Sequence, residues 1–464
     1  MSAGPDVTVV GGGISGLAAA WYMQRAGLRV RVLEQGNAPG GTIGTIEDGG
    51  WKIEKGPNSA LETTPLFGAM FGALGITGER LYADPAADRR YILRGGRLHA
   101  LPMSPGAFIA SSLWTARGKL RLLQEPFVGR AAAEETVAEF VRRRLGEEFL
   151  DYAINPFVAG VYAGDPSLLS VRAAFPKLYA LEARYGGLIR GMIGGMGERR
   201  RRAEKAKDRA RMFSFRSGMQ ALPRALGAAL GDALELGAAA EAVAKAPGGF
   251  TVRYRRGGEA RSVTSPAAVI AVPAYAAVGL VREIAGDAAA ILGRIAYPPV
   301  AEVFLGYPTG AIGRPLDGFG YLIPAKERRS TLGTIWSSAL FPGRAPAGHA
   351  ALTTFVGGAR QPALAALDDD ALTRAVTGDI REIMGVRGEP VYTKICRWER
   401  AIPQYAIGHL DLVGGLARCE ERLGGLYFCG NYRGGIALGD CLMSAESLAR
   451  RISGVVKTNN HQQP

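Results

Sequence analysis

Cysteine and histidine are scarce in this chain of 464 residues, which contains four of each. The cysteines form no CxxC pair, and no histidine stands at a spacing that is typical of a zinc site. This pattern favours reduced thiols in a cytosolic protein over a disulfide framework, and it predicts no metal centre. The residues concerned are Cys396, Cys419, Cys429, Cys441, His99, His349, His409 and His461.

Long hydrophobic runs without interruption are also lacking. The uncharged stretch Ser262–Val281 is long enough to cross a membrane, but Pro266 and Pro273 interrupt it. We therefore expect a buried strand and a turn there rather than a spanning helix. The first predicted strand already begins at Val7, so we expect no secretion signal before it.

Acidic residues are outnumbered, and the formal net charge is +14. Eight basic and two acidic residues lie between Arg199 and Arg211, which accounts for +6 of that charge. This run is either a solvated helix face or loop, or a patch for an anionic membrane surface. Nucleic acid is disfavoured as a partner because no aromatic residues are interleaved with the cations.

The N-terminal segment carries the clearest motif. A short apolar strand, Val7–Val10, runs into Gly11-x-Gly13-x-x-Gly16, and a helical pattern follows. A second strand pattern ends at Glu34. The glycines let backbone approach a pyrophosphate at a helix N-terminus, and the acid is placed to bind ribose hydroxyls. The order strand, glycine loop, helix, strand and acid predicts a dinucleotide site.

Three further segments decide which dinucleotide. Gly40-Gly41, the run Glu54-x-Gly56-Pro57-Asn58 and the C-terminal turn Gly430-Asn431 resemble the FAD superfamily that includes amine oxidases, phytoene desaturases and protoporphyrinogen oxidases. The resemblance implies FAD, held noncovalently because no cysteine is placed like a flavin tether. It also implies an oxidoreductase in which the helix after Gly430-Asn431 faces the reduced flavin. The cofactor-binding residues it implies are Gly11, Gly12, Gly13, Ile14, Ser15, Gly16, Glu34, Gln35, Gly40, Gly41, Thr42, Gly56, Pro57, Asn58, Ser59, Val243, Trp398, Gly430, Asn431, Ile436, Ala437 and Leu438. For Val243, a plain core valine is the alternative.

Within that superfamily, four segments resemble the oxygen-dependent protoporphyrinogen oxidases: 155–170 (NPFVAGVYAGDPSLLS), 318–324 (GFGYLIP), 397–410 (RWERAIPQYAIGHL) and 430–441 (GNYRGGIALGDC). The resemblance implies six-electron oxidation of protoporphyrinogen IX to protoporphyrin IX in haem biosynthesis, in three FAD/O2 cycles that each release H2O2. Catalysis is then flavin-borne, with no catalytic side chain. The substrate-binding residues it implies are Arg90, Gly160, Gly320, Leu322 and Phe355.

Arg90 is the implied partner of a substrate propionate, because a guanidinium pairs well with a carboxylate. Adjacent Arg89 leaves the register open, and a surface ion pair is the alternative role for Arg90.

Other functions on this fold stay open. The nearest is the same oxidation of coproporphyrinogen III to coproporphyrin III. An amine oxidase is disfavoured because no lysine lies between Lys245 and Lys326, and because Ile436-Ala437-Leu438 stands where an aromatic wall is expected. A carotenoid desaturase, or a flavoprotein that binds without turnover, would differ in whether a porphyrinogen reduces the flavin.

The expected fold class is α/β, with a discontinuous Rossmann-like FAD-binding domain, an α+β substrate domain and a mostly helical inserted domain. We assign residues 1–63, 212–275 and 395–464 to the first, 276–394 to the second and 64–211 to the third. The insert contains MSPGAFIASSLW (103–114), which is either membrane-facing or the core of the helical domain. We expect a cytoplasmic protein at the membrane surface, and a homodimer is left open.

Overall fold

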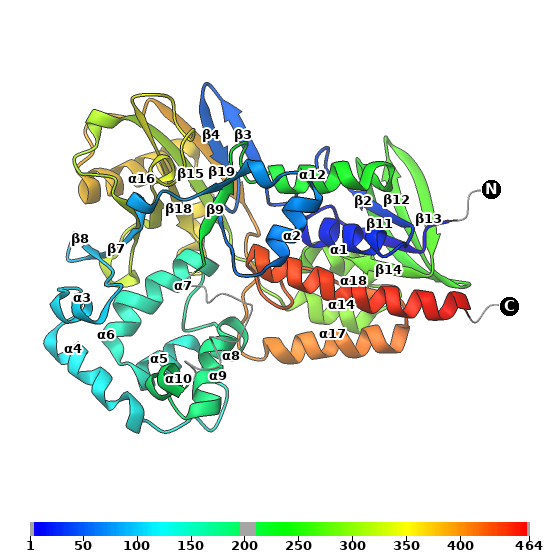
Figure 1. The fold of residues 1–464 in the computed structure, drawn as a ribbon, viewed down its shortest axis with the longest axis horizontal. Coiled ribbons are helices and arrows are strands. Elements are labelled where there is room, and N and C mark those ends of the chain that lie inside the picture. Colours follow the sequence, from blue (N-terminus) through cyan, green and yellow to red (C-terminus); the bar gives the residue numbers. More distant parts are fainter. Residues whose placement is uncertain (1–3, 195–209, 462–464) are drawn as a thin grey trace.

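A five-stranded parallel sheet forms the half of the molecule that holds both termini (Figure 1). In the computed structural model, which describes residues 4–194 and 210–461, every neighbouring pair in this sheet runs parallel. The carboxyl ends of all five strands therefore lie along one edge. Their order is β10 (Leu234–Leu236), β2 (Val30–Glu34), β1 (Val7–Val10), β14 (Ala267–Ile270) and β20 (Leu426–Phe428).

Helices cover both faces of the parallel sheet, which explains why all residues of β1 and β14 are buried. One face packs on α1 (Ile14–Arg25), α2 (Leu66–Ala73), α12 (Ala221–Leu230) and α18 (Leu438–His461). The other packs on α13 (Ala274–Val281), α14 (Gly286–Gly293) and α17 (His409–Leu423).

An antiparallel sheet of three strands packs on the same side as α13. It consists of β11 (Ala238–Ala246), β12 (Gly249–Arg256) and β13 (Glu259–Ser265). Residues 256–259 form the turn of a hairpin, with Gly257 and Gly258 at positive φ between the paired residues Arg256 and Glu259.

A seven-stranded mixed sheet lies in the other half of the molecule, away from the termini (Figure 1). Its strand order is β19 (Tyr392–Trp398), β15 (Val300–Pro308), β18 (His349–Gly357), β17 (Thr331–Ile335), β16 (Gly318–Leu322), β7 (Arg89–Arg94) and β8 (Arg97–Ala100). An amphipathic helix, α16 (Asp369–Met384), packs on this sheet. It buries Leu372, Val376 and Ile380 against one face of the sheet.

Smaller elements connect these layers. A hairpin is formed by β3 (Thr45–Asp48) and β4 (Trp51–Glu54), and a second three-stranded sheet by β5 (Ala60–Leu61), β9 (Met212–Phe215) and β6 (Arg80–Tyr82). The helical insert contains α3 (Pro105–Ala110), α4 (Ala116–Arg121), η3 (Leu122–Phe127), α5 (Val137–Arg144), α6 (Glu147–Phe149), η4 (Leu150–Ile154), α7 (Asn155–Tyr162), α8 (Val171–Ala174), α9 (Pro176–Tyr185) and α10 (Leu188–Gly194). Short connections are η1 (Thr77–Glu79), η2 (Pro85–Ala87), η5 (Gly231–Ala233), η6 (Thr309–Ala311), η7 (Ala325–Glu327), α15 (Ser337–Leu340) and η8 (Pro362–Ala366).

The fold class agrees with the α/β expectation, but the sheets do not follow the expected domain boundaries at three places. Strands β7 and β8 lie within the range 64–211 yet pair into the seven-stranded sheet, as does β19 beyond residue 394. Helices α13 and α14 pack on the parallel sheet rather than with the range 276–394. Long-range pairing decides these assignments, and local sequence pattern does not report it.

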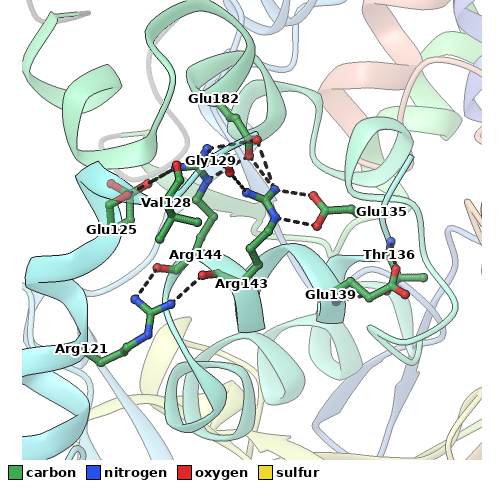
Figure 2. A network of polar contacts seen from close by, with 10 residues as sticks. All are labelled: Arg121, Glu125, Val128, Gly129, Glu135, Thr136, Glu139, Arg143, Arg144 and Glu182. Carbon is green, nitrogen blue, oxygen red and sulfur yellow. Dashed lines mark hydrogen bonds and ion pairs between the residues drawn. The ribbon is translucent and has the colours of Figure 1, made fainter. Parts of the chain in front are cut away.

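Buried charges hold the helical insert together (Figure 2). Arg144 is fully buried and pairs with Glu125 at 3.1 Å and with Glu182 at 3.1 Å. The Glu125 carboxylate also accepts hydrogen bonds from the backbone N–H groups of Leu188 and Ile189. Breaking such a pair strands a buried charge, so these contacts fix η3 against α5, α9 and α10.

No helix within residues 4–194 and 210–461 is long and apolar enough to cross a membrane. The basic run Arg199–Arg211 lies almost wholly outside the described residues. Its last residue, Arg211, stacks over the ring of Tyr82 at 3.3 Å from the ring centre.

Candidate functional site: a cofactor crevice facing a sheet

The glycine motif lies at the carboxyl edge of the parallel sheet, between the end of β1 and the start of α1. Gly11 has φ of 111°, and a Cβ there would come within 2.9 Å of the Ala271 backbone. A Cβ on Gly16 would lie 2.0 Å from the Gly11 carbonyl oxygen, so only glycine lets α1 start this close to the strand. Ligands of open parallel sheets bind at this edge.

A backbone cradle opens above Gly13. Gly13 forms a bridge with Gly40, and the Gly40 N–H donates to the Gly12 carbonyl at 2.9 Å. A Cβ on Gly13 would meet no atom within 4 Å, so open space lies beside this residue, whereas a Cβ on Gly41 would lie 3.2 Å from the Gly13 Cα. The first turn of α1 carries no acidic residue, so no side chain of the helix itself neutralises its positive end. These features suit the pyrophosphate of a dinucleotide.

Glu34 ends β2 beside this cradle. Its carboxylate accepts hydrogen bonds from the Gly12 N–H at 2.6 Å and the Gly36 N–H at 2.7 Å. Each carboxylate oxygen has a second acceptor site, so the same group can also accept from ribose hydroxyls. The structure adds a role that the motif did not indicate: Glu34 braces the glycine loop itself.

The segment after β4 forms a loop against the cradle and the seven-stranded sheet. A Cβ on Gly56 would lie 2.3 Å from the Thr42 carbonyl oxygen, which requires glycine at that crossing. Glu54 is buried and pairs with buried Arg344 at 2.7 Å. Burial raises the pKa of Glu54, and Arg344 opposes that change. The Nε1–H of Trp398 donates to the Lys55 carbonyl at 2.6 Å, so Trp398 anchors this loop.

One face of the seven-stranded sheet carries every predicted substrate residue that lies on its strands. Directly paired residues share a face, and the register pairs Arg90 with Gly320, Leu322 with Gly333, and Gly333 with Phe355. The same face continues through Glu302 and Val300 to Trp398. We call it the site face. It is the opposite of the face that α16 covers, because Tyr91, Tyr321, Ala301 and Val303 point to α16.

The register also separates the two neighbouring arginines. Arg89 is paired with Asp317 at 2.6 Å, whereas Arg90 is exposed and shares the site face with Leu322. The sequence could not distinguish them, because alternation along a strand is visible only once the strand's partners are known.

Helix α7 meets the site face at Gly160. A Cβ on Gly160 would lie 2.6 Å from Cδ2 of Leu322, so the absence of a side chain allows the helix to lie directly against β16. This contact joins the helical insert to the sheet.

The segment Ile402–His409, which we call the strap, links the insert to the C-terminal turn. Gln404 donates through Nε2 to the Tyr162 carbonyl at 2.9 Å, and the Ser170 N–H donates to the Tyr405 carbonyl at 2.8 Å. The Tyr405 hydroxyl donates to the Asn431 carbonyl at 2.6 Å and accepts from the Gly435 N–H at 3.0 Å. His409 Nε2 lies 3.0 Å from the Tyr432 carbonyl oxygen.

Through these contacts, the strap joins three of the segments that resemble the protoporphyrinogen oxidases. The strap (within 397–410) holds the end of the first segment (155–170) and the turn that opens the last (430–441). The family resemblance includes the strap but implies no role for its residues. The cluster of Gln, Tyr and His in a segment flanked by apolar residues is the sequence feature that indicates buried polar contacts there.

The turn that Tyr405 holds leads into α18. The predicted residues Ile436, Ala437 and Leu438 bring the chain to the first residue of that helix, at the carboxyl end of β20. Ser15 lies at the start of α1, and its carbonyl oxygen is 4.0 Å from Sγ of Cys429. The N-terminal glycine motif and the segment that leads into the C-terminal turn therefore meet beside the glycine cradle.

Val243 is placed differently from the other predicted cofactor residues. Its side chain is fully buried in the core shared by Leu33, Val252 and Ile270. Only its backbone, on β11 at the edge of the three-stranded sheet, is available for a ligand.

Comparison with known proteins agrees with this architecture. Residues 14–453 match the family model of the flavin containing amine oxidoreductases. A chloroplastic protoporphyrinogen oxidase of Oryza sativa subsp. japonica is 36% identical over 479 residues, covering 97% of this chain and 88% of the rice protein. Coproporphyrinogen III oxidase of Bacillus subtilis (strain 168) is 27% identical over 456 residues, covering 94% and 95%.

A solved structure from Exiguobacterium sp. 255-15, assigned as a protoporphyrinogen oxidase, shares the fold. Its TM-score is 0.79 at 24% identity, over 96% of this chain and 98% of the other. The glycine cradle, the match along almost the whole chain and the rice relative lead to one assignment. The chain belongs to the flavin-containing amine oxidoreductases, it uses FAD, and within that family it is a member of the protoporphyrinogen oxidases.

Proposed function

We propose that this enzyme oxidises protoporphyrinogen IX to protoporphyrin IX. The observation that carries the proposal is the site face, where exposed Arg90 shares one side of the sheet with Gly320, Leu322 and Phe355. A large apolar macrocycle with a carboxylate at its edge is complementary to such a surface. The high identity to plant protoporphyrinogen oxidases supports the same substrate.

Bound FAD supplies the two-electron acceptor chemistry. The residues proposed to hold it are the glycines at 11–16 and 40–41 for the pyrophosphate and Glu34 for the ribose. The loop at 56–59, Trp398 and the turn at 430–438 are proposed to hold the flavin. The protein's part is to orient the macrocycle on the site face and to keep the C-terminal turn and the N-terminus of α18 in place. A helix N-terminus favours the negative charge of a reduced flavin.

Dioxygen is the proposed electron acceptor. Six electrons separate substrate and product, so three H2O2 should form per porphyrin, without nicotinamide. Porphyrin fluorescence and peroxide are measured together in air; a requirement for NAD(P), or no product in oxygen, contradicts the proposal.

The alternative substrate is coproporphyrinogen III, and the Bacillus subtilis relative that is named for it supports keeping it. The two substrates differ by two propionates, so parallel kcat/KM measurements discriminate them. We expect anaerobic protoporphyrinogen IX to bleach the flavin faster. A flavin that neither compound reduces would instead favour a binding protein without turnover.

We further propose that the enzyme rests on an anionic membrane surface through the insert. Four exposed apolar side chains lie on α3, α4 and η3, at the end of the molecule away from the termini (Figure 1): Ile109, Leu120, Leu123 and Phe127. Phe127 is 85% exposed. Exposed cations, Arg117 and Arg130, lie on the same segment of chain. Apolar burial plus such charges binds anionic lipid.

The buried network of Figure 2 makes this surface rigid. Glu125 lies in η3 between Leu123 and Phe127 and is anchored to Arg144 and to the start of α10. Within residues 103–114, the alternative of a helical-domain core holds for Leu113 and Trp114. These two are buried, and Phe108 packs on Trp114 at 5.3 Å between ring centres.

A further inference from the structure

Glu302 is an acidic residue in the middle of an otherwise apolar strand, β15, and it is 2% exposed. Its neighbours across the sheet are Cys396 on β19 and Phe355 on β18. It therefore lies on the site face, between the proposed substrate wall and the segment that carries Trp398.

The Glu302 side chain makes a defined contact to the loop after β4. Nδ2 of Asn58 donates to Oε1 of Glu302 at 3.0 Å and to the Gly56 carbonyl oxygen at 3.0 Å. The two acceptors fix the orientation of the Asn58 carboxamide. With the bond from Trp398 to the Lys55 carbonyl, the loop is tied to β15 and β19 at two points.

We propose that Glu302 is a positioning residue of the FAD site, whose carboxyl group holds Asn58 and thereby the loop Lys55–Asn58 against the site face. This inference rests on the proposed flavin site, because that loop is proposed to border the flavin. Glu302 acts through Asn58 and is not proposed to contact substrate.

The surroundings favour the uncharged form of this carboxyl group. Burial raises its pKa well above the ordinary value, Asn58 opposes this, and Glu54 raises it further. Arg344 is the counter-charge of Glu54 rather than of Glu302. The neighbouring Cys396 carries no positive charge that could stabilise a Glu302 carboxylate, and burial raises the pKa of its thiol as well. A neutral acid still offers a carbonyl oxygen to Asn58, and it places no negative charge beside a flavin that becomes anionic on reduction.

Glutamine at this position keeps the carbonyl oxygen and the neutrality, whereas leucine keeps the size and loses the acceptor. The test compares the wild type with Glu302→Gln, Glu302→Leu, Asn58→Leu and the double leucine variant. The rate of FAD release from each holoenzyme is followed by the rise of flavin fluorescence after dilution. Glu283→Gln, at an exposed acid that pairs with Arg253, is the matched control.

Loss of one neutral hydrogen bond should make FAD release about three- to tenfold faster in Glu302→Leu. Glu302→Gln should stay within about twofold of the wild type. The double variant should be no faster than Asn58→Leu, because the two residues act as one contact. Should Glu302→Leu yield no holoenzyme, Asn58→Leu is compared in the wild-type and Glu302→Gln backgrounds, where equal losses are expected.

Wild-type release from Glu302→Leu would overturn the inference. Additive increases in the rate of FAD release in the double variant would also overturn it. So would a Glu302→Gln variant that releases FAD as fast as Glu302→Leu. The assay needs no porphyrinogen, so its failure is distinct from a failure of the proposed function, which would appear as bound flavin that protoporphyrinogen IX does not reduce.

Discussion

The imidazole of His409 stacks on the phenol of Tyr405, with ring centres 4.0 Å apart and planes 13° from parallel. Each side chain hydrogen-bonds to a different part of the C-terminal turn. His409 Nε2 bonds to the Tyr432 carbonyl, and the Tyr405 hydroxyl donates to the Asn431 carbonyl. Both side chains are almost fully buried. The pair therefore acts as one anchor for the turn that leads into α18.

Removal of the Tyr405 hydroxyl should loosen this anchor. Tyr405→Phe keeps the stack but leaves the Asn431 carbonyl and the Gly435 N–H without their partner. An unpaired buried polar group costs about 1–3 kcal/mol, so the free energy of unfolding in urea should fall by about that amount. Tyr179→Phe on α9 is the matched control. Equal stability of Tyr405→Phe and wild type would contradict the anchoring role.

His409 should make the protein sensitive to mild acid. Burial lowers the pKa of His409 from its ordinary value of 6.5. Below pH 6.5 the unfolded chain binds a proton at this residue while the folded chain does not, so stability is lost as the pH falls toward the folded-state pKa. His409→Gln keeps a donor for Tyr432 and cannot titrate. The measurement spans about pH 7.5 to 5, which brackets the ordinary pKa of histidine. Over this range the Tm of His409→Gln should fall less than the Tm of the wild type. Parallel falls in the two Tm values would contradict a role for His409 in acid sensitivity.

Arg90 and Arg89 should differ sharply when each is replaced by alanine. If Arg90 pairs with a substrate propionate, Arg90→Ala loses a charged hydrogen bond of about 1.5–3 kcal/mol, so kcat/KM should fall roughly 10- to 150-fold with FAD retained. Arg89→Ala breaks only an exposed pair with Asp317 and should change kcat/KM little. The reverse pattern would move the carboxylate contact to Arg89.

The contact of Gly160 with Leu322 predicts a compensating pair. Gly160→Val should force α7 and β16 apart or displace Leu322, at a cost of about 1–3 kcal/mol in stability and with a lower kcat/KM. Leu322→Ala in the same chain opens the space again and should recover part of the stability loss. Purely additive losses in thermal unfolding would show that the two residues are not coupled.

The exposed side chains of η3 should control membrane binding. Leu123→Ser with Phe127→Ser removes two apolar groups that would each contribute about 1.5–3 kcal/mol when buried, so partition into anionic vesicles should drop at least about tenfold. Val391→Ser, at an apolar residue that is 57% exposed and directly precedes β19, should have no effect. Protein that stays at the bottom of a flotation gradient at low salt would refute the surface proposal.

Several parts of this molecule are readable from local sequence, and the reason is physical. The glycine loop, Glu34 and α16 depend on contacts between residues close in the chain or on one periodicity. The seven-stranded sheet is different, because β7 pairs with β16, which lies more than two hundred residues later. Local pattern does not report that partnership, so the sequence predicts a mostly helical insert over 64–211 and misses β7 and β8.

The candidate site shows the same limit. Arg90, Gly320, Leu322 and Phe355 came from family resemblance, and only the strand register places them on one face. Glu302 was missed because one glutamate in the run AEVFLGY does not disclose whether its side chain is buried. Its signal was present all the same: an acid in a strand whose other residues are apolar needs a partner or a use.

Strands β6 and β9 have a consequence for how this chain can be remodelled. The chain leaves the FAD half at β6 and returns at β9, and Tyr82 pairs directly with Phe213. The long excursion between them starts and ends at adjacent positions, so its length is not constrained by the distance that it must span. Exchange of the excursion between homologues would leave the nucleotide-binding sheet intact, but it would carry β7, β8 and Arg90 of the site face with it. Tyr82 and Met212 are therefore the natural junctions for chimaeric enzymes that exchange the excursion as one piece.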